Sequence, residues 1–163
     1  MIAKKALYPA INNSSWGEIY AVAGKDAERA KTLSPSGRVY TDYQELIDDP
    51  NVEAIYISLP NSLHIPWSIK AMRAGKDVLC EKPLAMNANE VREATTVARE
   101  TGRLFMEASW NRWHPRTKRL AEVVHSGEIG KIERIKTCFT YDGLPDENIR
   151  AFPELGGGGL YDL

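Results

Sequence analysis

The stretch that most constrains the fold of this chain is residues 77–83, Asp-Val-Leu-Cys-Glu-Lys-Pro. Its three apolar residues form a short run bounded by Gly75 and Pro83, which is typical of a strand buried in a parallel sheet. Open α/β sheets bind their ligands just beyond the carboxyl ends of such strands. The sequence therefore places Lys82 at the mouth of a ligand crevice, where a lysine near low-dielectric walls can act as a general acid or base. The alternative is a solvated surface lysine with no chemical role.

Predicted strands and helices alternate along residues 18–108. The strands are expected at 18–23, 38–40, 54–59, 77–80 and 104–108, and capping residues or glycines mark the ends of the helices between them. This rhythm is typical of successive βαβ units, so we predict an α/β fold with a doubly wound parallel sheet. A strand predicted at 132–141 breaks the rhythm. We therefore expect a first domain over residues 1–128 and the beginning of an α+β domain over residues 129–163.

Composition excludes several classes of protein. The formal net charge of −1 gives no reason to expect nucleic acid or an anionic membrane as a partner. No apolar run approaches the ~20 residues that span a bilayer, and no signal peptide opens the chain. Cys80 and Cys138 fit neither a metal-binding spacing nor a disulfide framework, so no metal site is expected. A cytoplasmic location is the default expectation.

Three motifs carry a family resemblance. They are Leu-Pro-Asn-Ser-Leu-His at 59–64, Ala-Gly-Lys-Asp-Val-Leu-Cys-Glu-Lys-Pro at 74–83, and the glycines at 156–158 that lead to Asp162. Together they resemble the Gfo/Idh/MocA oxidoreductases. The resemblance implies a Rossmann domain that binds NAD or NADP, followed by an α+β domain that supplies the substrate pocket and the oligomer contact. It also implies hydride transfer to or from a hydroxyl-bearing carbon of a sugar, cyclitol or diol, in a homo-oligomeric parent protein.

The chain departs from the family pattern at both ends. Family members open with an apolar strand and a glycine-rich loop, and residues 1–3 correspond to the end of that loop. A catalytic histidine follows the aspartate of the glycine motif, and here the sequence stops one residue after Asp162. We therefore expect a fragment of a longer dehydrogenase. Because the first strand is central in the order 3-2-1-4-5-6, two strand edges should be unpaired and the chain alone marginally stable and inactive.

The resemblance assigns two catalytic residues. Lys82 corresponds to the lysine that contacts the nicotinamide ribose and the substrate hydroxyl, and we expect it to relay a proton. Asp162 corresponds to the aspartate that helps to position the substrate. Glu81 is expected either to orient Lys82 or to form a surface ion pair worth ~0–1 kcal/mol. The resemblance also suggests a cis Lys82–Pro83 peptide bond.

Further residues are expected to bind the cofactor. Leu59, Pro60, Asn61 and His64 should line the dinucleotide crevice, although Asn61 could equally cap the helix that follows and His64 could face solvent. Lys25 follows the first predicted strand, where a cation suits the 2′-phosphate of NADP, so NADP is slightly favoured over NAD; an exposed turn lysine is the alternative.

Arg112 is the candidate for contact with the nicotinamide amide, since family members carry an arginine in a similar segment. A rival function remains open, namely a non-catalytic nucleotide-binding or regulatory remnant of such a dehydrogenase. An incomplete gene model with no separate role is the third possibility.

Overall fold

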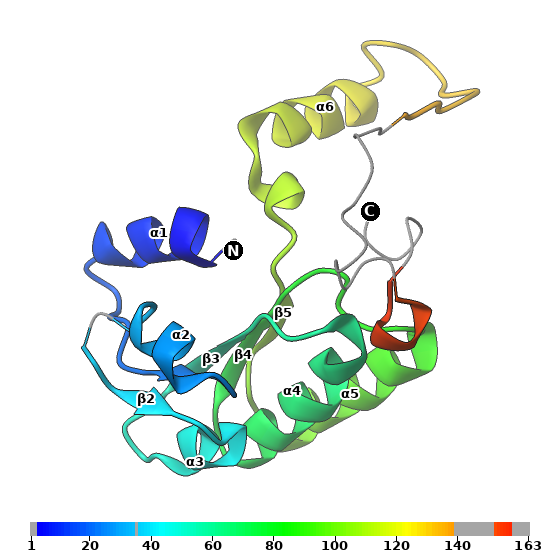
Figure 1. Cartoon of the computed structure of the whole chain (residues 1–163). Coiled ribbons are helices and arrows are strands. Elements are labelled where there is room, and N and C mark those ends of the chain that lie inside the picture. Colours follow the sequence, from blue (N-terminus) through cyan, green and yellow to red (C-terminus); the bar gives the residue numbers. More distant parts are fainter. Residues whose placement is uncertain (1–2, 35, 139–151, 158–163) are drawn as a thin grey trace.

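The computed structural model describes residues 3–34, 36–138 and 152–157. The strands are β1 (Val22–Ala23), β2 (Val39–Tyr40), β3 (Ala54–Ile57), β4 (Asp77–Cys80) and β5 (Phe105–Glu107). The helices are η1 (Ala3–Leu7), α1 (Tyr8–Asn12), α2 (Ala27–Lys31), α3 (Tyr43–Asp48), η2 (Asn61–Leu63), α4 (His64–Arg73), α5 (Ala88–Thr101), η3 (Trp110–Trp113), α6 (Pro115–His125) and η5 (Pro153–Leu155). Figure 1 shows α1 and α2 on one side of the strands and α3, α4 and α5 on the other, so the predicted α/β doubly wound class is confirmed.

All strand pairs are parallel, but the strands form two separate sheets. One sheet has the order β1-β2 and the other β3-β4-β5. Within the described part of the chain, no backbone hydrogen bond joins β1 to β3. This is the split expected when the central strand of the order 3-2-1-4-5-6 is absent from between them.

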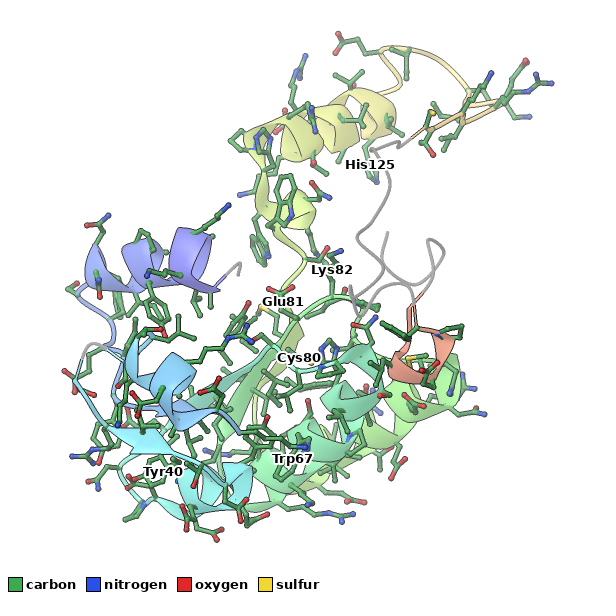
Figure 2. All side chains as sticks on the ribbon, in the orientation of Figure 1. Tyr40, Trp67, Cys80, Glu81, Lys82 and His125 are labelled. Carbon is green, nitrogen blue, oxygen red and sulfur yellow. The ribbon has the colours of Figure 1, made fainter. Side chains whose placement is uncertain are left out.

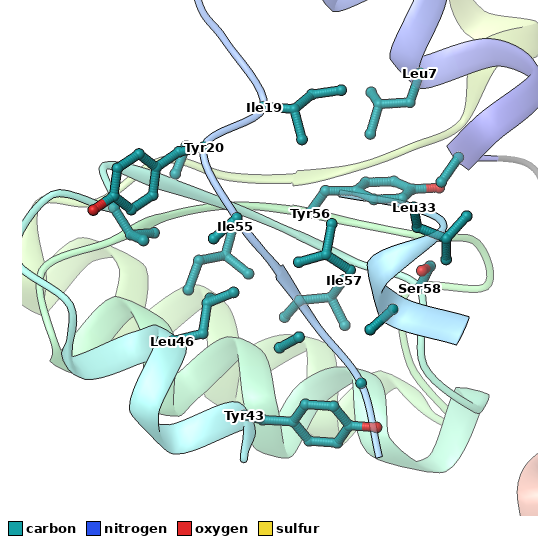
Figure 3. A pocket seen from close by; sticks show the side chains of 18 of the residues that line it. Leu7, Ile19, Tyr20, Leu33, Tyr43, Leu46, Ile55, Tyr56, Ile57 and Ser58 are labelled. Carbon is teal, nitrogen blue, oxygen red and sulfur yellow. The ribbon is translucent and has the colours of Figure 1, made fainter. Parts of the chain in front are cut away.

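The facing edges of β1 and β3 carry backbone groups that point into the gap. The carbonyls of Glu53 and Ile57 accept hydrogen bonds from the N–H of the first residue of β4 and from the N–H of the residue that follows β4. In a strand, alternate residues direct their backbone groups to opposite sides. Ala54 and Tyr56 therefore turn their N–H and C=O groups toward β1. A cavity of about 710 Å³ lies between the two sheets, and side chains such as Leu7, Leu46 and Ile55 line it (Figure 3).

The core lies between the three-stranded sheet and the helices α4 and α5. The apolar face of α4 is buried, with Ile65 2%, Ile69 8% and Met72 0% exposed, and it packs against β4 and α5. Three helices begin at the side-chain caps that the sequence predicts: Asp26 accepts from Arg29 N–H, Asp42 from Gln44 N–H, and Asn87 from Asn89 and Glu90 N–H.

Two predicted strands need correction. The strand predicted at 18–23 is reduced to Val22–Ala23, because among the described residues it pairs only with the two-residue β2. The strand predicted at 132–141 is wrong for residues 132–138, which are exposed and form no ladder, while 139–141 lie outside the described residues. A strand needs a neighbour to satisfy its backbone groups, and none of the described segments pairs with this one. In Figure 1, α6 extends away from the layered body.

Candidate functional site

The loops that follow β3 and β4 lie side by side at the carboxyl edge of the sheet. The parallel register pairs Ile57 with Cys80, so the segment 58–61 and the segment 81–83 leave the sheet at the same level. Figure 2 shows Glu81 and Lys82 just beyond the end of β4, above Cys80. This is the position at which open α/β sheets bind ligands.

Glu81 is held from two sides. Its Oε1 accepts a hydrogen bond of 2.5 Å from the Tyr56 hydroxyl, and its Oε2 accepts one of 3.2 Å from the Lys82 backbone N–H. Burial, followed by this bond to Glu81, raises the pKa of Tyr56, so the phenol keeps its proton and remains a donor. The Glu81 carboxylate thus fixes the backbone of Lys82, whose peptide bond to Pro83 is cis, as the resemblance suggested.

His64 lies beneath the two loops and joins them. Its side chain belongs to the first residue of α4 and is 1% exposed, so the solvent-facing alternative is wrong. Nδ1 lies 2.7 Å from the Pro83 carbonyl oxygen and Nε2 lies 2.9 Å from that of Leu59. Both ring nitrogens therefore lie against backbone oxygens, and His64 supports the crevice by connecting the loop after β3 to the loop after β4.

Asn61 connects a distant segment to the same loops. It makes no capping bond to the helix that follows, so the capping alternative is wrong. Its Nδ2 instead donates a hydrogen bond of 2.7 Å to the Gly156 carbonyl. Gly156 has φ +82° and a Cβ there would lie 2.5 Å from Met86 Sδ and 2.6 Å from Asn61 Cβ. Only glycine fits this close approach, which brings part of the glycine motif to the crevice.

The remaining predicted residues that the structure describes follow three different strands, β1, β3 and β5. Lys25 is exposed after β1 and lines the same cavity as Leu59. Arg112 is exposed on η3, beyond the end of β5. Pro60 is half-buried in the loop after β3. Asp162 lies outside the described residues, so its proposed role has no structural counterpart here.

Two residues of this network were missed in the sequence, Tyr56 and Glu107. Glu107 ends β5, and its Oε1 accepts a hydrogen bond of 2.9 Å from the Leu84 N–H, which holds the segment after Pro83. Each residue carries a signal that could have been read. A tyrosine within an apolar strand needs a partner for its hydroxyl, and a carboxylate at the end of a buried strand needs donors.

The described residues around these loops include neither a metal-binding cluster nor an accessible thiol. Among the described residues, no group of three or more His, Cys, Asp or Glu side chains is arranged to hold a metal ion. Cys80 is 0% exposed, and burial raises its pKa to about 12. None of the described helices has the length and apolar character that crossing a membrane requires.

Comparison with known proteins identifies relatives over most of the chain. The family model GFO_IDH_MocA, described as an oxidoreductase family with an NAD-binding Rossmann fold, matches residues 1–109. An uncharacterized oxidoreductase, ORF334, of Rhizobium meliloti is 40% identical over 99% of the chain and 49% of its own length. Trans-1,2-dihydrobenzene-1,2-diol dehydrogenase of Mus musculus is 39% identical over 92% of the chain and 46% of its own length.

A solved structure matches the same share of the chain. The 3-ketoreductase KijD10 of Actinomadura kijaniata, in complex with NADP and TDP-benzene, superposes with a TM-score of 0.92 at 35% identity, covering 99% of this chain and 50% of that one. The chain thus spans about half the length of the relatives that it matches.

Proposed function

Because the chain belongs to the Gfo/Idh/MocA family of NAD-binding oxidoreductases, we propose that its protein moves hydride between NAD or NADP and the hydroxyl-bearing carbon of a sugar, cyclitol or diol. The observation that carries the proposal is the placement of Lys82 at the carboxyl edge of a parallel sheet, with its backbone held by Glu81. Relatives whose names specify a diol dehydrogenase and a 3-ketoreductase support this class of substrate.

The donors at the crevice suit a dinucleotide. Asn61, Lys25 and Arg112 follow β3, β1 and β5 and offer amide, ammonium and guanidinium groups, which are the usual donors to phosphate and ribose oxygens. Lys25 would meet a ribose 2′-phosphate, so we favour NADP slightly over NAD. The NADP in the Actinomadura reductase supports that preference.

Lys82 is proposed to handle the proton of the reaction. When bound, the nicotinamide supplies a hydride acceptor for the substrate carbon. The Lys82 amine takes the hydroxyl proton as the carbon–oxygen double bond forms, and in the reverse direction its ammonium returns that proton to the oxygen. Asp162 is proposed to position the substrate beside it. Because the strand that precedes Lys25 and the strand that precedes Lys82 belong to two separate sheets, we expect the 163-residue chain to be inactive by itself.

Turnover can be tested in a chimera that extends this chain at both ends with the corresponding parts of the Actinomadura reductase. Replacing Lys82 by alanine should lower kcat by about 10²–10⁴-fold, the usual contribution of a general acid or base, with the Kd of NADPH largely unchanged. An unchanged kcat would remove Lys82 from the chemistry. Tight NADPH binding without turnover in the unmutated chimera would favour the non-catalytic alternative instead.

A further inference from the structure

The gap between β1 and β3 is bounded by two strand edges whose backbone groups point into it. The N–H groups of Val22 and Gly24 donate hydrogen bonds of 3.1 and 3.0 Å on the β2 side, so the backbone groups of Ala23, between them, point the other way. Those of Ala54 and Tyr56 point into the gap from β3. In the part of the chain that the structure describes, none of these three residues has a backbone hydrogen bond across a ladder or to a loop. Since buried N–H and C=O groups need partners, the two edges require something between them that can both donate and accept.

Apolar side chains close both faces of the gap. Leu7 and Leu33 reach the cavity from η1 and from the turn after α2, and Tyr43 and Leu46 reach it from α3 (Figure 3). The first pair lies on the α1 and α2 side of the strands and the second pair on the opposite side (Figure 1). A strand that is covered on both faces in this way is typically apolar at nearly every position and parallel to its neighbours.

The volume of the gap matches one short strand. In packed sheets a strand takes up about 4.8 Å between neighbours, about 10 Å through the layer and about 3.3 Å of length per residue, which is about 160 Å³ per residue. The cavity of about 710 Å³ therefore has room for roughly four to five residues. The adjacent β3 has four residues, Ala54–Ile57, so the gap has the length of the strand beside it.

We propose that this gap is a strand-acceptor site, in which a separate polypeptide inserts an extended apolar segment of about five residues. The inserted segment pairs with β1 on one side and β3 on the other, and so joins the two sheets into one. Strand addition of this kind takes its affinity from backbone hydrogen bonds and its specificity from the side-chain pockets. Proline is excluded from the segment, because each residue must donate its N–H to one of the two neighbouring strands.

A second copy of this chain does not supply a matching segment from its described unpaired residues. The apolar strands β3 and β4 are already paired with each other. The exposed segment 132–138 forms no ladder, but in an extended conformation it places Glu133 on one face and Arg134 and Lys136 on the other. Every register of this segment would bury a charge between apolar walls, which is costly without a partner.

The test uses the unmutated ¹⁵N-labelled chain and the synthetic peptide KKVAVIVKK, whose terminal lysines keep the apolar segment in solution. With free peptide at about ten times its Kd, hydrogen exchange of the amides of Ala23, Ala54 and Tyr56 should slow by about 10-fold, with one peptide bound per chain. The Phe105 N–H faces the outer edge of β5, since Leu104 and Ala108 bond to β4, and its exchange should not change. Gap amides that exchange equally fast with and without about 1 mM peptide, a concentration that detects even weak binding, would overturn the proposal.

A matched control peptide separates strand pairing from uptake of any apolar molecule. It carries N-methyl groups on two successive central residues, which keeps every side chain but removes one N–H toward β1 and one toward β3. Loss of two hydrogen bonds should weaken binding by at least about 10-fold, and equal affinity of the two peptides would overturn strand pairing. Protection of the gap amides without peptide would also overturn the proposal, and a rise of that protection with chain concentration would identify a second copy as the occupant. No cofactor takes part in these measurements, so their outcome is independent of the proposed oxidoreductase function.

Discussion

Lys76 belongs to the Ala-Gly-Lys stretch that carries the family resemblance, yet its side chain points away from the crevice loops. It is 7% exposed, and its Nζ donates hydrogen bonds of 2.7 Å to the carbonyls of Asp49 and Val52. Those residues form the turn between α3 and β3 and are themselves 9% and 8% exposed. Lys76 therefore ties the amino end of β4 to the connection that leads into β3.

Replacing Lys76 by methionine should destabilise the chain substantially. Methionine keeps the apolar stem but leaves the buried Val52 carbonyl without a donor, which costs about 1–3 kcal/mol, while the Asp49 carbonyl keeps the Val52 N–H as its donor. Relief of the desolvation of a buried cation offsets part of this cost, so we expect a net loss of about 1–2 kcal/mol in the free energy of unfolding. For a domain of this length, that loss corresponds to a fall in Tm of roughly 2–8 °C.

The assay is urea unfolding followed by tryptophan fluorescence. The K76M variant should show a lower midpoint with an unchanged slope, the signature of lost stability without a change in the unfolded state. The matched control is K136M, which replaces an exposed lysine and should change the unfolding free energy by less than about 0.5 kcal/mol. If the two variants unfold at the same midpoint, water replaces the Lys76 bonds and the buried-carbonyl reasoning is refuted.

Three further predictions follow from single contacts. A thiol reagent should modify exposed Cys138 in the native chain and spare Cys80, whose pKa burial raises to about 12; a C138S chain that reacts without denaturant would contradict this. In G156A the new Cβ meets Met86 and the positive φ adds strain, so amide exchange over residues 152–157 should rise by about 10-fold while the core amides are unchanged. Hydrogen bonds from a tyrosine hydroxyl and from a backbone N–H lower the pKa of Asp49, so the stability that its carboxylate contributes is present above its ordinary pKa and is lost as pH falls through the lowered pKa. Urea midpoints taken from neutral pH to about pH 3 should therefore fall less steeply with acid in D49N than in the unmutated chain. An equally steep fall in D49N would contradict the assignment.

Helix starts were predictable from the sequence because their causes are local. Asp26, Asp42 and Asn87 each cap a helix through bonds to residues two or three positions away, so the signal lies within one turn of chain. The buried stripe on α4 follows from the period of 3.6 residues alone. The split of the sheet was predicted by comparing the order of the expected strands with the family pattern, and the structure shows two separate sheets.

The contacts that build the site were not predictable in this way. Tyr56 meets Glu81 across 25 residues and His64 meets Pro83 across 19, and both pairings depend on the register of β3 against β4. The prediction of a strand at 132–138 was wrong because it also depended on a distant partner. Its alternating pattern describes a surface that fits a sheet, but a strand exists only where a neighbour supplies hydrogen bonds.

The two halves of the proposed cofactor site are built with unequal support. The half that holds Lys82 rests on a three-stranded sheet and on the bonds of His64, Glu81 and Glu107. The half that holds Lys25 rests on a sheet of two strands, two residues each, across a cavity of about 710 Å³. A dinucleotide that bridges both halves must fix their separation at the expense of its own binding energy, because ordering a loosely joined element costs conformational entropy. Weak NADPH binding by this chain would therefore reflect the split in the sheet, and a segment that pairs with both β1 and β3 should raise the affinity without touching the cofactor.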